Sequence, residues 1–446
     1  MASDMNDTLE WLEADGLGGF ASGTATGRRT RRYHAVLLTA TVPPTGRTVL
    51  VNGFDAWVET PNGRYAISSQ RYEPDVIYPD GDRRVEHFET EPWPRWRFRL
   101  EDGTTVEQEI FARSGCAAVA LAWRLADAAP GVRLIVRPFL SGRDYHASHH
   151  ENAAFRSAAE VCRDTLVWRP YDGVPAVVSV ANASYSPEPT WYRNFLYKEE
   201  QARGLDCTED LASPGVLTWD LSAGEAAWVL AAEGAAGVAS DGSADARALV
   251  DAWRSAEQTR RRFPTRLHRA ADAYVVRRGT GKTIIAGYPW FTDWGRDTFI
   301  ALRGVCLAAG RIDEARAILL AWAETVSEGM LPNRFPDQGQ QPEFNAVDAS
   351  LWYVVAAGEL MAAPSEQSVR RRPACARACD CRHRSRLCRG NAIRHPDGCR
   401  WTARRRHSRR STDLDGCACG RPGDHAADWK ARGSSGLVDQ RACRCR

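Results

Sequence analysis

Long hydrophobic runs are absent from this chain of 446 residues. No segment approaches the roughly 20 consecutive apolar residues that a membrane-spanning helix needs. The N-terminal stretch 1–16 is acidic and lacks the basic and apolar regions of a secretory signal peptide. These absences predict a cytoplasmic protein without a membrane partner, and the length allows two or three domains with separate cores.

Cysteine is scarce in the first 367 residues. Only four of the 13 cysteines lie there, widely spaced and without the pairing of metal ligands: Cys116, Cys162, Cys207 and Cys306. This distribution predicts buried thiols in a protein of a reducing compartment. No cofactor and no metal site is implied.

Large aliphatic residues, Phe and Tyr are scarce in the last 79 residues. From Ser368 onward there is no Phe or Tyr, and only one Ile, three Leu and two Val occur. The same segment has 20 Arg and one Lys against seven Asp, which gives it a net charge of +14. Because the whole chain has a net charge of +3, the first 367 residues have a net charge of −11. A segment of this composition cannot pack a core, which predicts a disordered basic tail over 364–446. Its nine cysteines never form the paired CxxC of a structural zinc site.

Helical patterns are missing between residues 33 and 234, where short β-type runs alternate with turn residues. In RWRFRLEDGTTVEQEIF, Asp102-Gly103 separates two alternating runs, which is a strong hairpin signal. Many short strands without intervening helices predict an antiparallel β-sandwich, which we assign to 1–239.

Two polar segments of this region can be interpreted either as loops without a ligand or as binding sites. The basic cluster at 27–32, GRRTRR, could bind phosphate or nucleic acid, but we expect a solvated loop. The segment at 142–150, GRDYHASHH, resembles a metal cluster, yet no cysteine or carboxylate set completes it. We expect a loop at a domain interface there.

The chain becomes helical by composition after residue 240, with Pro264 as a break. We expect a helical linker over 240–264 and a second, helical domain over 265–363. In that domain Thr292 or Asp293 can cap a helix that Gly310 ends, the next helix starts at Ile312, and a third covers 345–360.

Aromatic and charged residues alternate in the segment 290–297, WFTDWGRD. A pyranose has C–H faces that stack on aromatic rings and rim hydroxyls that suit carboxylate acceptors and guanidinium donors. The segment therefore suits a sugar site. The pair Asp293 and Arg296, three residues apart, could equally be an ordinary ion pair at the start of a helix, with the rings in the core. The residues alone leave both interpretations open.

A family resemblance favours the sugar site. The segment WFTDWGRDTFIALRG at 290–304, with NAVDASLWYV at 345–354, resembles the amylo-α-1,6-glucosidase domain of bacterial and archaeal glycogen debranching enzymes. The segment 10–38, EWLEADGLGGFASGTATGRRTRRYHAVLL, resembles the opening of the same family's N-terminal domain. The resemblance implies an (α/α)6 barrel, here incomplete, that hydrolyses α-1,6-glucosidic linkages of glycogen or a branched α-glucan.

The resemblance also implies a substrate site and a mechanism. An inverting glycosidase uses an acid and a base carboxyl group about 6.5–9.5 Å apart. Arg296 and Asp297 are expected to bind the hydroxyls of the terminal glucose, Trp294 and Phe291 to stack on it, and Asn345 and Asp348 to face the same cavity.

A shifted reading frame accounts for the composition of the tail. Permitted codons for TDLDGCACG at 412–420, read one nucleotide later, give LTWMDARVG, which resembles the family's general-acid motif. Permitted codons for RHPDGCRW at 394–401 likewise give GIRMDADG. We therefore predict that this frame has no catalytic acid or base.

Three consequences follow from the shifted frame. The helical barrel should lack partners for some of its apolar faces, so that the chain aggregates. A non-catalytic α-glucan-binding protein is the alternative function. The arginines of the tail, explained by the codons, give no reason to expect a nucleic-acid partner.

Overall fold

A computed structural model describes residues 7–335 and 342–363. The tail predicted over 364–446, with the shifted codons at 394–401 and 412–420, lies outside the described residues. Within the described ranges, no helix combines the length and the apolar character needed to cross a membrane.

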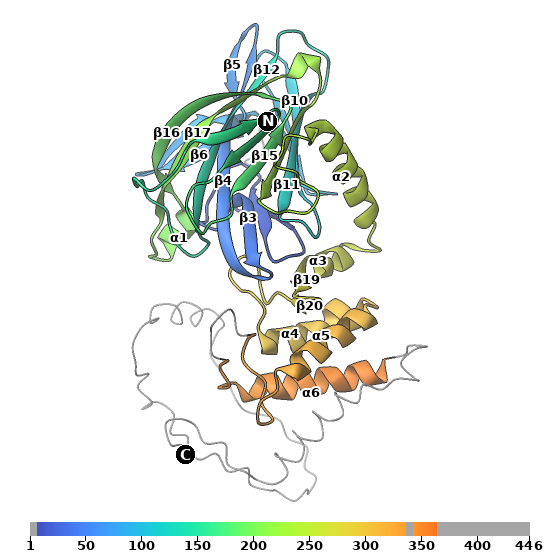
Figure 1. Cartoon of the computed structure of the whole chain (residues 1–446). Helices are drawn as coiled ribbons and strands as arrows, with labels where there is room; N and C mark the ends of the chain where they lie inside the picture. The colour runs from blue at the N-terminus through green and yellow to red at the C-terminus, as the bar shows by residue number, and fades with distance from the viewer. Residues whose placement is uncertain (1–6, 336–341, 364–446) are drawn as a thin grey trace, which may run out of the picture. The chain divides into compact units, whose positions relative to one another are not determined.

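Two antiparallel sheets build the N-terminal part of the chain (Figure 1). The larger sheet has the strand order β1-β2-β3-β4-β12-β17-β16-β6-β7, and β5 pairs with β4 at its side. Its strands are β1 (Glu10–Ala14), β2 (Phe20–Thr24), β3 (Ala35–Val42), β4 (Thr45–Thr60), β5 (Gly63–Ala66), β6 (Ser69–Tyr72), β7 (Val76–Asp80), β12 (Arg133–Asp144), β16 (Ser184–Leu196) and β17 (Thr208–Asp220).

The smaller sheet has the order β13-β14-β15-β18-β11-β10-β9-β8. Its strands are β8 (Val85–Glu89), β9 (Arg95–Arg99), β10 (Thr105–Ala112), β11 (Ala118–Leu125), β13 (Ala159–Cys162), β14 (Thr165–Trp168), β15 (Val177–Ala181) and β18 (Ala226–Ala232). Strands β9 and β10 form the hairpin predicted at Asp102-Gly103, where Gly103 takes a φ of 89° that a side chain disfavours. The prediction of an antiparallel β-rich domain is confirmed.

A tryptophan-rich core joins the two sheets. Trp123 on β11 stacks on Trp228 on β18 at a ring-centroid distance of 6.3 Å, and Trp219 on β17 lies 6.0 Å from Trp123. Val58 on β4 and Leu121 on β11 are fully buried in the same cluster. Burial of such large rings dominates the stability of the domain, because the hydrophobic free energy scales with the apolar area removed from water.

Helix α2 (Ala246–Arg260) covers the outer face of the smaller sheet at β11, β15 and β18 (Figure 1). Val250 and Trp253 of α2 pack on the alanine-rich face of β11 and β18. The Asp245 side chain caps the helix by accepting hydrogen bonds from the first-turn amides. The chain breaks at Pro264, as predicted, and continues in α3 (Arg266–Tyr274). The remaining short helices of this part are α1 (Lys198–Ala202), η1 (Gly81–Arg84) and η2 (Leu221–Ala223).

Three longer helices form the next part of the chain, after the hairpin of β19 (Val275–Arg278) and β20 (Gly281–Ile284). They are α4 (Gly295–Leu302), which continues as the π-helical turn η3 (Arg303–Ala308), α5 (Ile312–Glu324) and α6 (Val347–Ala362). One ring from each helix meets in their core, where Phe299 lies 5.2 Å from both Trp322 and Tyr353 between ring centroids. The (α/α)6 barrel and the domain boundaries stay predictions.

Several details of the sequence-based expectations are wrong. Neither Thr292 nor Asp293 caps α4, because Trp294 is its N-cap residue and makes no side-chain cap. Asp293 is 1% exposed and its carboxylate lies 3.1 Å from the Arg278 guanidinium. A buried carboxylate needs a cationic partner more than a helix needs a cap, so the ion pair decides its position.

The basic cluster at 27–32 is not a solvated loop. Arg29 is 6% exposed, donates to the Gln70 side chain and lies over the Phe195 ring. Arg32 is 9% exposed and its guanidinium lies 3.7 Å from the buried Glu200 carboxylate. Arg29 and Arg32 therefore lie in the interior of the β-domain, and the half-buried Arg28 and Arg31 pair with carboxylates.

Buried thiols were predicted for the four cysteines of this region, and the structure confirms this for two of them. Cys116 and Cys306 are buried, and burial raises the pKa of each thiol to about 11. Cys207 is half-buried, and Cys162 is exposed because its strand β13 forms an edge of the smaller sheet. The prediction is wrong for Cys162.

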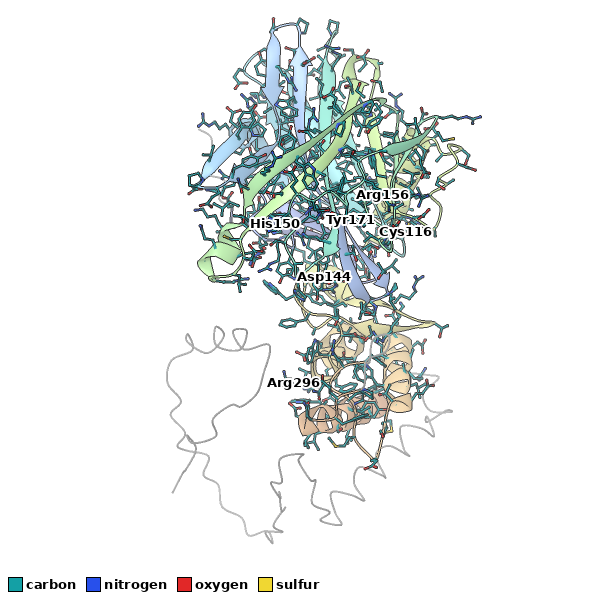
Figure 2. The ribbon with its side chains drawn as sticks, turned by 60° about the vertical axis from the view of Figure 1, so that its left-hand side comes forward. Cys116, Asp144, His150, Arg156, Tyr171 and Arg296 are labelled. Atoms are coloured by element: carbon teal, nitrogen blue, oxygen red, sulfur yellow. The ribbon has the colours of Figure 1, made fainter. Side chains whose placement is uncertain are left out.

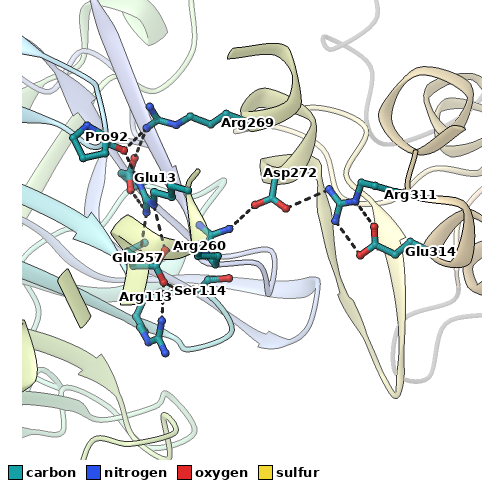
Figure 3. Close-up of polar contacts among 12 residues, drawn as sticks. Glu13, Pro92, Arg113, Ser114, Glu257, Arg260, Arg269, Asp272, Arg311 and Glu314 are labelled. Atoms are coloured by element: carbon teal, nitrogen blue, oxygen red, sulfur yellow. Dashed lines mark hydrogen bonds and ion pairs between the residues drawn. The ribbon is translucent and has the colours of Figure 1, made fainter. Parts of the chain in front are cut away.

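Glu257, near the end of α2, joins that helix to the β-domain (Figure 3). Its buried carboxylate accepts hydrogen bonds from the Arg113 guanidinium at 2.8 Å and from the Ser114 amide at 3.0 Å. It also pairs with Arg260 and Arg261. Burial alone would raise the pKa of Glu257, but the Ser114 amide and Arg260 outweigh burial and lower it.

The Glu257→Gln variant is expected to lower the free energy of unfolding at pH 7 by about 3 kcal/mol, because three arginines lose a buried anionic partner. Since folding lowers the pKa of Glu257, its ionised carboxylate stabilises the fold fully at pH values well above the ordinary pKa of 4.5. That stabilisation is lost as the pH falls below 4.5 and through the lower folded value. Denaturant titrations of variant and parent should therefore converge at acid pH.

The control for this prediction is Glu188→Gln, which breaks the exposed pair of Glu188 with Arg137. It is expected to cost less than about 1 kcal/mol, because solvent screens such pairs. Equal losses from the two variants at pH 7 would contradict the structural role of Glu257.

The first residue of α4, Gly295, fits closely against α5. An added Cβ would lie 3.1 Å from the Pro332 carbonyl oxygen and 3.3 Å from the Trp322 ring. Gly295→Ala is expected to destabilise the fold by about 1–3 kcal/mol through overpacking. Gly358→Ala on α6 is the matched control, since nothing lies within 4 Å of its added Cβ. Alanine there should stabilise the helix by up to about 1 kcal/mol. Urea unfolding measures the change in stability of both variants. A Gly295→Ala variant that is more stable than the parent would refute the close fit.

Candidate functional site

The predicted substrate-binding residues gather where α4 and α6 begin. Arg296 and Asp297 lie in the first turn of α4, and Asp348 lies in the first turn of α6. Arg296 extends from α4 (Figure 2). Its guanidinium lies 3.4 Å from the Asp348 carboxylate, so two segments about fifty residues apart in the sequence meet at one point.

Arg296 lies between two carboxylates. Besides Asp348, its guanidinium lies 3.8 Å from the carboxylate of Asp297. The three side chains remain between 40% and 56% exposed. Exposed ion pairs contribute little to stability, so these groups can exchange their partners for ligand hydroxyls at small cost. We call Arg296, Asp297 and Asp348 the Arg296 cluster.

The Arg296 cluster lies at the N-terminal ends of two helices. The first amides of a helix lack partners inside the helix, and the helix dipole makes its N-terminal end positive. Asp297 and Asp348 lie at these ends, and a carboxylate acts only as a hydrogen-bond acceptor. The cluster therefore offers guanidinium donors and carboxylate acceptors side by side.

Asn345 is linked to the start of α4 through Asn333. The Asn345 side chain accepts a hydrogen bond from the Asn333 side chain. The Asn333 carbonyl in turn accepts from the Gly295 amide at 2.7 Å. A short bridge between Trp294 and Arg334 adds a second link. The segment around Asn333 thus ties the two helix starts together, and nothing in the sequence-based argument gave it a role.

The aromatic residues of the predicted site differ in exposure. Phe291 is 45% exposed and lies in the turn that precedes α4, where its amide donates to the Gly287 carbonyl. Trp294 is half-buried at the N-cap of α4. Phe291 is therefore the more exposed of the two aromatic residues.

Residue Trp290, beside Phe291, was assigned no role from the sequence. Its half-buried ring contacts Arg31, Arg203 and Tyr33 of the β-domain. Only the aromatic composition of 290–297 pointed to it, since none of its partners is near in the sequence.

A cavity of about 1090 Å³ is lined in part by Glu13, Arg269, Asp272 and Arg311, and none of the six predicted substrate-binding residues lines it. Its charged groups pair with each other (Figure 3). In the described part of the chain, no group of three or more His, Cys, Asp or Glu side chains is placed to hold a metal ion.

The segment 142–150 serves structural contacts. Its His149 ring bonds the Asp210 carbonyl and the Tyr171 hydroxyl, and burial lowers the pKa of His149. Tyr145 donates its hydroxyl to the Trp290 carbonyl at 3.1 Å, next to the predicted sugar site.

Two protein-family models match this chain, the first over the β-domain and the second over the helical part. Residues 9–228 match the family model "Glycogen debranching enzyme N terminal", and residues 269–374 match the model "Amylo-alpha-1,6-glucosidase". A stretch of 79 residues is 44% identical to the glycogen debranching enzyme of Saccharomyces cerevisiae. That stretch is 17% of this chain and covers 5% of the yeast protein. From these matches, this chain belongs to the glycogen debranching enzyme family.

Proposed function

We propose that this chain binds glycogen or a related branched α-glucan at the Arg296 cluster. The observation that carries the proposal is the exposed guanidinium of Arg296 between two half-exposed carboxylates, where two helices begin. The exposed Phe291 ring precedes the same helix. The family membership supplies the chemical class of the ligand.

The geometry suits the terminal glucose of a glucan chain. The carboxylates of Asp297 and Asp348 can accept hydrogen bonds from two adjacent hydroxyls, and the Arg296 guanidinium can donate to ring or hydroxyl oxygens. Phe291 can stack on the C–H face of the ring. Since α-glucans are uncharged, recognition depends on these directional bonds, and affinity should change little with salt.

We further propose that this chain does not hydrolyse the α-1,6 linkage. Hydrolysis needs one carboxyl group that protonates the leaving oxygen and a second that activates water on the opposite face of the sugar. We assign Asp297 and Asp348 to hydroxyl binding beside Arg296, and Asp293 is buried with Arg278. The acid and base of the family are expected in the segment whose codons are shifted.

An incomplete (α/α)6 barrel is part of the proposal. Exposed apolar side chains on the described helices support it, because further helices of a barrel would cover them. These are Ile300 on α4 and Val347, Leu351 and Val355 on α6, each between 41% and 45% exposed. An uncovered face of this kind promotes self-association.

Binding and hydrolysis can be measured separately on the full chain. Titration calorimetry with a maltooligosaccharide and with glycogen should show binding, while glucose release from a limit dextrin should stay at background. Asp348→Asn and Asp297→Asn are each expected to weaken binding about tenfold, because a charged acceptor of hydroxyl protons is lost.

Asp313→Asn is the matched control for these variants. Asp313 also lies in the first turn of a helix, α5, and pairs with Arg316 at 2.7 Å. Its variant should bind like the parent. Equal affinity in all three variants would refute the assignment of the Arg296 cluster, and glucose release would refute the loss of hydrolysis.

A further inference from the structure

The turn Gly287–Phe291, which leads into the predicted glucan site, is attached to the β-domain. Its ends pair with each other, since the Phe291 amide donates to the Gly287 carbonyl at 2.8 Å. All three residues between them, Tyr288, Pro289 and Trp290, contact side chains of the β-domain. We call these five residues the aromatic turn.

Two buried side chains hold the backbone of the aromatic turn. The Arg47 guanidinium donates to the Pro289 carbonyl at 3.1 Å and lies 5.2 Å from the centre of the Tyr288 ring. The Tyr145 hydroxyl donates to the Trp290 carbonyl at 3.1 Å. Arg47 is 1% and Tyr145 8% exposed, so solvent does not compete for these bonds.

The indole of Trp290 is held by three further side chains. The guanidinium carbons of Arg31 and Arg203 lie 5.5 and 5.6 Å from its ring centre, within the range of a cation–π contact. Tyr33 approaches edge-on, with the ring centroids 6.4 Å apart. Arg31 is itself fixed by an ion pair with Glu10 at 2.8 Å. The partners of one indole thus come from separate segments of the β-domain.

Trp290 and Phe291 differ in their contacts with the β-domain and therefore in the roles we assign to them. The Trp290 ring is occupied by two guanidinium groups and a tyrosine edge, whereas its neighbour Phe291 is 45% exposed. An exposed ring on a free turn would lose conformational entropy on binding a ligand, which lowers affinity. The Phe291 ring loses less conformational entropy on binding, because the neighbouring Trp290 is already fixed.

We propose that the β-domain preorganises the glucan site, with Arg31 and Arg203 as positioning residues that act through Trp290 on the Phe291 ring. This inference rests on the proposed glucan binding and adds to it the source of the ring's preorganisation. The β-domain then contributes to affinity without touching the sugar.

The test compares Arg31→Met and Arg203→Met with Arg64→Met in the full chain. Arg64 lies over the Trp57 ring at 4.7 Å and is 52% exposed, so it makes the same kind of contact away from the aromatic turn. Each of the first two variants is expected to raise the Kd for a maltooligosaccharide about threefold. Arg64→Met should leave the Kd unchanged.

A double-mutant cycle with Phe291→Ala separates positioning from a general loss of stability. If Arg203 acts through Phe291, the Phe291→Ala variant should lose less affinity in the Arg203→Met background than in the parent. Equal losses in both backgrounds would overturn the inference. Unfolding curves of each variant check that the fold persists. Tyr145→Phe, which removes only the hydroxyl on the Trp290 carbonyl, replaces any variant that fails to fold and should show the same coupling.

The outcomes distinguish this inference from the function on which it rests. Absence of glucan binding by the parent chain would refute the proposed function itself. Binding by the parent, with affinities of the Arg31 and Arg203 variants equal to that of the Arg64 variant, would overturn only the role of the β-domain.

Discussion

The buried guanidinium of Arg47 connects the β-domain to the chain that enters the helices. It donates to the Gly18 and Pro289 carbonyls, which lie about 270 residues apart, and the rings of Phe20, Tyr145 and Tyr288 surround it. A buried charge is tolerated only where such partners surround it. The nearby Asp15 shows the cost of incomplete compensation, because burial raises the pKa of its carboxyl group to about 7 although Arg47 and backbone amides oppose this.

Local patterns predicted much of the fold. Alternating residues around Asp102-Gly103 gave the β9–β10 hairpin, the break at Pro264 gave the boundary between α2 and α3, and helical periodicity gave α5. These features depend on neighbours within a few residues, so they can be read from the sequence. The basic cluster at 27–32 could not be read in this way, because its buried partners Gln70 and Glu200 lie far along the chain.

The candidate site was also predictable only in part from the local sequence. The residue types around Arg296 suggested sugar chemistry, but the approach of Asp348 to Arg296 depends on the packing of α6 against α4, which the Phe299, Trp322 and Tyr353 rings decide. The structure adds Asn333 as the link between the two helix starts. Spacing within one segment cannot predict contacts of this kind, because they arise from tertiary packing.

Helix α2 follows β18 in the sequence and covers the alanine-rich face of β11 and β18 with Val250 and Trp253. Small side chains on a strand leave a flat surface that only a closely fitting partner can shield. The smallest unit in which this alanine-rich face is shielded from water therefore extends through α2. A β-domain separated at residue 239 would present that flat face to water and to other chains.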